Sequence, residues 1–401
     1  MRKNTIQNSL NTNTKYKVIY GGWYQRTTLH LSEIYSLFMH GTSNLNLSKS
    51  ELKRLQKDLH LVEIHRESGY FEYIKAKTIS GIEIRYYEDG LYILEIASDS
   101  IFTAQKTLEK YFEDNLNPAI AYIFSLGAPT PKVLANIKTN HPVAISVLNE
   151  NNQDFNFDES IFGETYNKIS SGGLTVYKTP QYIFVSAPKE LNKYINDIIE
   201  MQIFFREFKD QLEKYLYIHR TIWEEISNIK EAKIIIGKDV DGIRGKLDGY
   251  QKTINLISNR INQMNSYITT RSSIAKHLEI EKELVSLFEY KFETLTDTLS
   301  YIKEIWKMTN DYLSSAIGNL VEIKNQSTSN NLKSLQTITS IGVISGILGY
   351  LSANTIPHVS IAGAIYFVIL FCLTWFMNFI IVKKYQNKKY SLKFGDRASD
   401  L

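Results

Sequence analysis

The chain has 401 residues, which is enough for a membrane unit together with one or two soluble domains. Lysine and arginine number 46 and aspartate and glutamate 42, so the net charge of +4 is too small to indicate a nucleic-acid-binding surface. The single cysteine, Cys372, excludes an intrachain disulfide and a cysteine-based zinc site.

Residues 1–14 are rich in asparagine and threonine and have no apolar core, which predicts a disordered leader and not a signal peptide. Residues 15–188 have the pattern of a mixed α/β domain, which we expect to be cytoplasmic. We expect its helices at Leu29–Met39, Lys49–Leu59 and Ser100–Glu113. We expect its strands at Tyr16–Tyr20, Gly69–Lys75, Ile82–Tyr87, Leu91–Ile96, Ile120–Phe124, Val143–Leu148, Leu174–Tyr177 and Tyr182–Ser186.

No catalytic set is recognisable in the sequence. The eight histidines are scattered, and there is neither a nucleophile elbow nor a dinucleotide-binding fingerprint. The sequence therefore predicts a protein that is not an enzyme and that needs no cofactor.

Residues 189–278 are expected to form a helical arm. Leu191–Ile229 is amphipathic, and apolar residues then follow at the alternating three- and four-residue spacing of a coiled coil. These residues are Ile254, Ile257, Ile261, Met264 and Ile268. Between the two patterns, the four glycines of Ile236–Gly249 predict the turn of a helical hairpin.

Residues 279–334 contain no proline and one glycine, Gly318. Apolar residues recur there at helical spacing, which predicts one long stalk helix that continues into the apolar segment after it. The expected length approaches about 70 residues, or about 100 Å. The polar stretch 325–331 is either a ring of polar side chains at a pore mouth or a fraying joint.

From Ser334 to Val382 the chain has no Asp, Glu, Lys or Arg, and its strongly polar breaks are Asn354, Pro357 and His358. A span needs roughly 20 apolar residues, so we expect transmembrane helices at 335–354 and 360–382, joined by an outer loop at 355–359. The tail, 383–401, is rich in lysine, which places it in the cytoplasm by the positive-inside rule. Two spans then place both termini in the cytoplasm, in a multi-pass protein of the cell (inner) membrane.

The first expected span differs from the second in its small and hydroxylated residues. The hydroxyl groups of Thr337, Ser340, Ser345 and Ser352 could line a water-filled path, whereas Gly342, Gly346 and Gly349 allow close helix packing. Close packing alone would also explain the pattern. Two helices cannot enclose a pore, so any pore requires an oligomer.

The order of these segments resembles the CorA family of divalent-cation transporters and channels. In that family the first span ends in Tyr-Gly-Met-Asn, whereas this chain has Leu351, Ser352, Ala353 and Asn354, so the glycine and methionine are missing and only the asparagine matches. The resemblance implies a homo-oligomer, with five subunits as the expected number. It also implies that Asn354 lies at the outer pore mouth and contacts the water shell of Mg²⁺ or a related divalent cation.

In that family, acidic side chains at subunit interfaces bind Mg²⁺ and keep the pore shut. Asp239, Asp241 and Asp248 lie close together in the sequence and are candidates for that role. The alternative is that they are ordinary solvent-exposed acids. The same segment begins like a phosphate-binding or calcium-binding loop, but Ile243 occupies a position where each motif needs a polar ligand.

The expected function is therefore a CorA-like membrane channel or transporter for divalent metal cations, gated by its cytoplasmic domain. One alternative is a membrane effector of CRISPR-type antiviral signalling with a CorA-like pore, whose soluble domain binds a small nucleotide-type ligand. Another is a non-transporting scaffold anchored by the apolar hairpin. The expected partners are further copies of the chain and the lipid bilayer, with no nucleic-acid polymer.

Overall fold

The computed structural model describes residues 16–24, 31–68, 71–126, 141–149, 157–171, 173–188, 194–231, 234–277, 281–351 and 361–391. The expected leader (1–14), the expected outer loop (355–359) and the end of the basic tail (392–401) lie outside these residues. The described chain divides into two compact units, one of residues 1–218 and 256–304, the other of residues 219–255 and 305–401.

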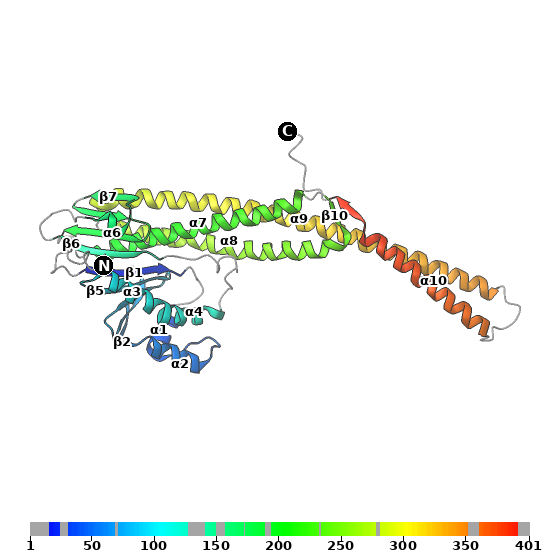
Figure 1. Ribbon diagram of the computed structural model, residues 1–401, viewed down its shortest axis with the longest axis horizontal. Coiled ribbons are helices and arrows are strands. Elements are labelled where there is room, and N and C mark those ends of the chain that lie inside the picture. The colour runs from blue at the N-terminus through cyan, green and yellow to red at the C-terminus, as the bar shows by residue number, and fades with distance from the viewer. Residues whose placement is uncertain are drawn as a thin grey trace, which may run out of the picture. The chain divides into compact units, whose positions relative to one another are not determined.

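A nine-stranded sheet forms the centre of the first unit (Figure 1). Its order is β2-β3-β4-β5-β1-β6-β9-β8-β7, and all neighbours are antiparallel except β6 and β9. The strands are β1 (Tyr16–Trp23), β2 (Leu61–Ser68), β3 (Glu72–Thr78), β4 (Glu83–Tyr87), β5 (Leu91–Ser98), β6 (Val143–Asn149), β7 (Asn167–Ser171), β8 (Leu174–Lys178) and β9 (Tyr182–Pro188).

Short helices cover one face of this sheet. They are α1 (Leu31–His40), α2 (Lys49–Asp58), α3 (Ile101–Tyr111) and α4 (Asn117–Ile123), with a single helical turn, α6 (Glu159–Phe162), later in the chain. Strand residues alternate between faces, so Val18 and Tyr20 of the central strand belong to the core beneath these helices. Lys17, Ile19 and Trp23 lie on the opposite face of β1.

The expected strand at Ile120–Phe124 was wrong, because this run is helical. A π-helical turn, η1 (Phe112–Leu116), joins α3 to α4, and a 3₁₀ turn, η2 (Phe124–Leu126), follows α4. Pro118 at the start of α4 has no N–H to donate, which explains the wider turn before it. A short apolar run fits a strand and a buried helix equally well, which accounts for the error.

Three long helices follow the sheet: α7 (Ile195–Glu231), α8 (Val240–His277) and α9 (Glu281–Leu351). The start of α7 packs on the second face of β1, where the Trp23 ring contacts the rings of Phe204 and Phe208 at 5.7 Å and 5.6 Å. α9 has 71 residues, which confirms the expected long helix. It runs through 325–331 without a break, so no joint interrupts the backbone there.

The five apolar residues expected to form a coiled-coil stripe on α8 are all buried, at 4% exposure or less. The segment Ile236–Gly249 differs from the expected turn. A short strand, β10 (Ile234–Ile236), and a 3₁₀ turn, η4 (Gly237–Asp239), precede α8, which already begins at Val240. Asp241 in the first turn of α8 favours this earlier start, because acidic side chains stabilise helix N-termini.

The last helix is α10 (Ile361–Gln386), and a short strand, β11 (Lys389–Ser391), follows it. β11 pairs antiparallel with β10, with Ile235 opposite Tyr390. The α/β domain and the long helices are thus present as the sequence predicts, whereas the domain boundaries drawn from the sequence stay predictions.

Candidate functional site

The C-terminal part of α9 and the whole of α10 form an apolar helical hairpin. Lys324 of α9 forms a 2.6 Å ion pair with Asp241, and β11 pairs with β10 a few residues before Asp241. Both arms therefore have one end beside the segment 234–241. From Lys324 to Leu351 the first arm spans about 40 Å at about 1.5 Å per residue, and α10 is of similar length.

The hairpin exposes large apolar side chains along both arms. They include Leu332, Leu335, Ile341, Val343, Ile344 and Ile347 on α9, and Ile361, Ile365, Val368, Ile369, Phe371, Leu373, Trp375, Phe376, Met377, Phe379 and Ile380 on α10. An exposed apolar surface of this extent marks a site of contact with another protein or with lipid. Among the described residues no helix combines the length and apolar content needed to cross a membrane, so the two expected spans are not confirmed.

The predicted pore residues lie on or just beyond α9. Thr337, Ser340 and Ser345 are exposed, and the Thr337 hydroxyl donates to the carbonyl of Lys333 at 2.9 Å. Ser352 and Asn354 lie outside the described residues. The role of all five side chains stays a prediction.

The predicted packing glycines, Gly342, Gly346 and Gly349, lie in the same arm. A Cβ atom added at any of them would meet no atom of the described residues within 4 Å. Among the described residues, the small-residue face of α9 is therefore open to an added Cβ atom.

The three predicted regulatory acids do not converge in the described structure. Asp241 pairs with Lys324. Asp248 lies 3.6 Å from Arg244, one turn earlier in α8. Asp239 is exposed in η4. Within the described residues no group of three acidic, histidine or cysteine side chains could hold a metal ion, and the regulatory metal site stays a prediction.

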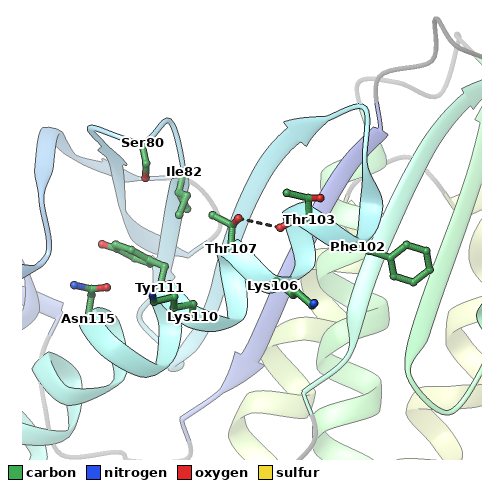
Figure 2. A pocket seen from close by; sticks show the side chains of 9 residues that line it. All are labelled: Ser80, Ile82, Phe102, Thr103, Lys106, Thr107, Lys110, Tyr111 and Asn115. Atoms are coloured by element: carbon green, nitrogen blue, oxygen red, sulfur yellow. Dashed lines mark hydrogen bonds between the residues drawn. The ribbon is translucent and has the colours of Figure 1, made fainter. Parts of the chain in front are cut away.

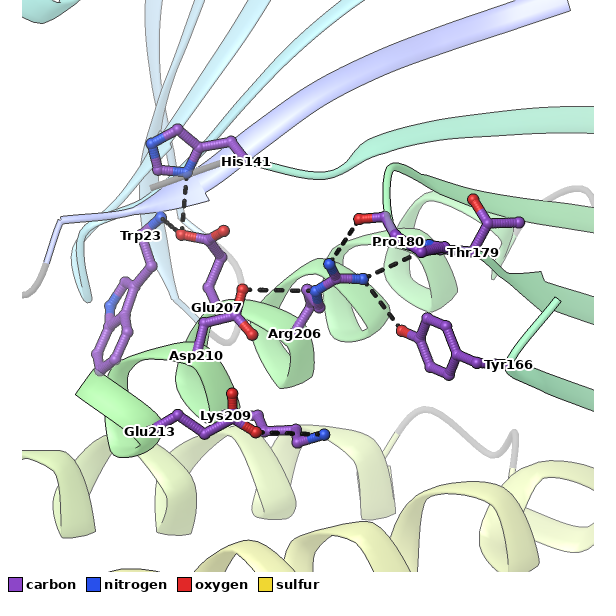
Figure 3. A network of polar contacts seen from close by, with 10 residues as sticks. All are labelled: Trp23, His141, Tyr166, Thr179, Pro180, Arg206, Glu207, Lys209, Asp210 and Glu213. Carbon is purple, nitrogen blue, oxygen red and sulfur yellow. Dashed lines mark hydrogen bonds and ion pairs between the residues drawn. The ribbon is translucent and has the colours of Figure 1, made fainter. Parts of the chain in front are cut away.

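A second candidate region lies where α7 meets the sheet, and Figure 3 shows its polar contacts. Glu207 accepts a hydrogen bond from the backbone N–H of Trp23 at 3.3 Å and lies 3.1 Å from Nδ1 of His141. One position earlier on α7, Arg206 donates to the backbone carbonyl of Pro180 at 2.8 Å and to the Tyr166 hydroxyl at 3.0 Å. These bonds fix the register of α7 against β1 and the β8–β9 turn.

The buried or half-buried cations near the edge of this region have carboxylate partners. Buried Arg85 pairs with Glu95 at 2.7 Å and with Glu200 at 3.0 Å, and half-buried Lys17 pairs with Glu95 at 2.7 Å. Arg271 pairs in the same way with buried Asp89. This arrangement is expected, because an unpaired buried charge is costly.

Two lysines, Lys178 at the end of β8 and Lys291 on α9, differ from these cations. Lys178 is 8% exposed, and Nζ of Lys291 is enclosed and meets no hydrogen-bond acceptor among the described residues. Burial and the adjacent Lys291 lower the pKa of Lys178 to about 6, and burial also lowers the pKa of Lys291. This pair was not predicted from the sequence, because nothing in the sequence signals that residues so far apart meet.

A shallow groove beside α3 is a third candidate region, and Figure 2 shows its lining. Its volume is about 450 Å³, and Lys106, Lys110, Thr103 and Thr107 of α3 contribute to it. The size falls within the range of small-molecule sites. Its two lysines give it a positive character that suits an anionic ligand.

No family model matches the sequence, and no curated protein matches it. Among solved structures, the chain is similar to the CorA magnesium transporter from Methanocaldococcus jannaschii. The identity is 10% and the TM-score 0.31, with 63% of this chain and 93% of that chain covered. This structural similarity is weak, and it carries no argument about the function of the chain.

Proposed function

We propose that the chain is a membrane-anchored, homo-oligomeric channel or transporter for divalent metal cations, of CorA type, gated by its α/β domain. The observation that carries the proposal is the apolar hairpin, which exposes large hydrophobic side chains on both arms. Lipid is the environment that would cover such a surface on every side. The charge-free part of the first arm, 334–351, is about 27 Å long and α10 about 39 Å, close to the roughly 30 Å hydrocarbon thickness of a bilayer.

The two arms suit different positions in an oligomer. The first arm has exposed hydroxyl groups at Thr337, Ser340 and Ser345 and an open glycine face. Several copies of this arm would enclose a path lined by hydroxyl groups, with the aromatic second arm outside. Exposed lysines lie at the C-terminal end of α10 and just after it, namely Lys383, Lys384, Lys388 and Lys389. They favour a cytoplasmic location for the base of the hairpin.

The test is Mg²⁺ flux into proteoliposomes that contain the full chain. We expect flux with the wild type, a large loss with Asn354→Ala, and wild-type flux with the control Asn387→Ala, which removes an exposed amide beyond α10. An amide at the pore mouth accepts hydrogen bonds through the water shell of the ion, which alanine cannot do. Equal flux in all three proteins would contradict the role of Asn354.

The groove beside α3 favours a ligand-gated membrane effector as the second candidate. Such a protein would leak both ions and small dyes, without strong ion selectivity, only after a ligand binds its α/β domain. Vesicles that stay silent although they contain intact oligomers would favour this candidate over a constitutive transporter. A nucleotide that then releases an entrapped dye would establish it.

A further inference from the structure

Lys178 and Lys291 come from elements that are far apart in the sequence and meet in the first unit. Lys178 ends β8, where it lies opposite Asn167 of β7 and Ile183 of β9. The ammonium group of Lys291 lies 5.7 Å from the centre of the Phe205 ring on α7. The two lysine side chains are adjacent where β8, α7 and the start of α9 meet.

Further cations surround this pair. Arg206 binds the carbonyl of Pro180, two residues after Lys178, and Lys209 lies one turn further along α7. Both Arg206 and Lys209 raise the positive potential at Lys178. Two carboxylates, Asp210 and Glu213, lie 3.4 Å and 3.5 Å from Arg206 and Lys209, and so compensate these outer cations.

No described carboxylate compensates the inner pair itself. The strand neighbours of Lys178 are an asparagine and an isoleucine. On α9, the positions three or four residues from Lys291 are Leu287, Phe288, Thr294 and Leu295, none of which is acidic. Because adjacent buried ammonium groups repel each other and lose hydration, they are stable in the charged form only beside an anion.

We propose that Lys178 and Lys291 form the floor of a binding site for a small oxyanion of the phosphate class. A phosphate oxygen accepts from each ammonium group, and Arg206 and Lys209 contribute longer-range attraction. Lys178 is only 8% exposed, so the anion is a free phosphate or the phosphoryl end of a small monoester, and not a lipid headgroup. The cation–π contact with Phe205 holds the Lys291 side chain in place for this task.

This site is independent of the proposed ion path, because none of its residues belongs to the hairpin. An absence of Mg²⁺ flux would therefore not contradict the proposed phosphate site, and an absence of phosphate binding would not contradict the proposed channel. Binding here would link the ends of β8, α7 and α9, and would stabilise their packing.

The test is isothermal titration calorimetry with inorganic phosphate on the full chain in detergent, at pH 7 and constant ionic strength. We expect one phosphate per chain, and binding weaker by about tenfold or more in Lys178→Met and in Lys291→Met, because each loses a charged donor. Lys291→Arg keeps a charged donor and should retain measurable binding. The control Lys106→Met removes a lysine from the α3 groove and should bind like the wild type.

Phenyl phosphate in place of inorganic phosphate separates the two sources of the anion. Tighter binding of phenyl phosphate would show that the site takes a monoester, whereas binding of inorganic phosphate alone would show that it takes the free ion. The proposal is overturned if the wild type binds neither compound at millimolar concentration. It is also overturned if both methionine variants fold and bind phosphate as well as the wild type.

Discussion

The ion pair between Asp89 and Arg271 should be one of the strongest single links between the sheet and α8. Asp89 lies in the turn between β4 and β5, and its two carboxylate oxygens accept from Nε and Nη2 of Arg271 at 2.8 Å and 3.0 Å. The side chains are 0% and 4% exposed. The guanidinium group also lies 4.9 Å from the ring centre of Phe71 and 5.3 Å from those of Tyr87 and Phe204.

Asp89→Asn removes the charge and keeps the shape. Removal of one partner from a buried ion pair costs about 3–5 kcal/mol, because the other charge remains buried without compensation. Asparagine still accepts one hydrogen bond, so we expect a loss of about 3 kcal/mol in local stability. At about 1.4 kcal/mol per factor of ten, amide hydrogen exchange near Arg271 should accelerate by about a hundredfold.

The assay is hydrogen exchange read by mass spectrometry on the full chain in detergent, in peptides around positions 89 and 271. The control is Asp58→Asn, which breaks a 3.0 Å pair with Arg54 whose side chains are 42% and 59% exposed. Exposed pairs contribute at most about 1 kcal/mol, so we expect a change of less than about fivefold there. Equal acceleration in the two variants would refute the reasoning. Adding Arg271→Met to Asp89→Asn should recover part of the loss, because it removes the unpaired charge.

Three further predictions concern single side chains. Burial raises the pKa of Asp197 to about 6. The stability that the protonated carboxyl group contributes is therefore fully present below about pH 4 and is lost as the pH rises through 6. Asp197→Asn should therefore raise the melting temperature at pH 7.5 and leave it unchanged at pH 4, and no difference at pH 7.5 would contradict this. Gly346→Leu should dissociate the proposed oligomer in light scattering without loss of helical circular dichroism, because no described residue lies within 4 Å of a new Cβ. The control Gly242→Leu on α8 should stay oligomeric. Gly90→Ala should destabilise the fold by about 2 kcal/mol or more in urea denaturation. Gly90 has a φ of +87°, and an added Cβ would lie 2.2 Å from the Tyr24 carbonyl oxygen. An unchanged denaturation midpoint would contradict this prediction.

The long-range pattern of the sequence predicted the helical half of the structure well. A helix of more than 50 residues without proline shows its period many times over, so α9 was predictable from Glu279 onward. Short elements were harder to predict. β2 (Leu61–Ser68) was missed because most of its side chains are exposed and give no apolar alternation. The strand assigned to Ile120–Phe124 was wrong because its few apolar residues could not reveal a helical period.

The apolar hairpin could be located from composition, since the charge-free run from Ser334 to Val382 needs no tertiary information. Its geometry could not be predicted, because the pairing of β10 with β11 joins segments more than 150 residues apart. That pairing places the ends of both arms beside one segment of the chain. The sequence therefore predicted that a hairpin exists, and the structure adds where its base is held.

The two buried cations on the consecutive helices α8 and α9 show why a site can be invisible in the sequence. Arg271 and Lys291 lie in similar amphipathic patterns, and either could have been expected on a solvated face. The fold buries both, but it brings Asp89 to Arg271 and brings a second lysine to Lys291. The Arg271–Asp89 pair needs no additional counterion, because its two charges cancel. The lysine pair is stable in its charged form only when an anion is present, so occupancy of the site and the packing of α9 against the sheet must be thermodynamically linked. In a protein whose proposed ion path continues from α9, that linkage would connect an anion bound at the sheet to the helix that enters the hairpin.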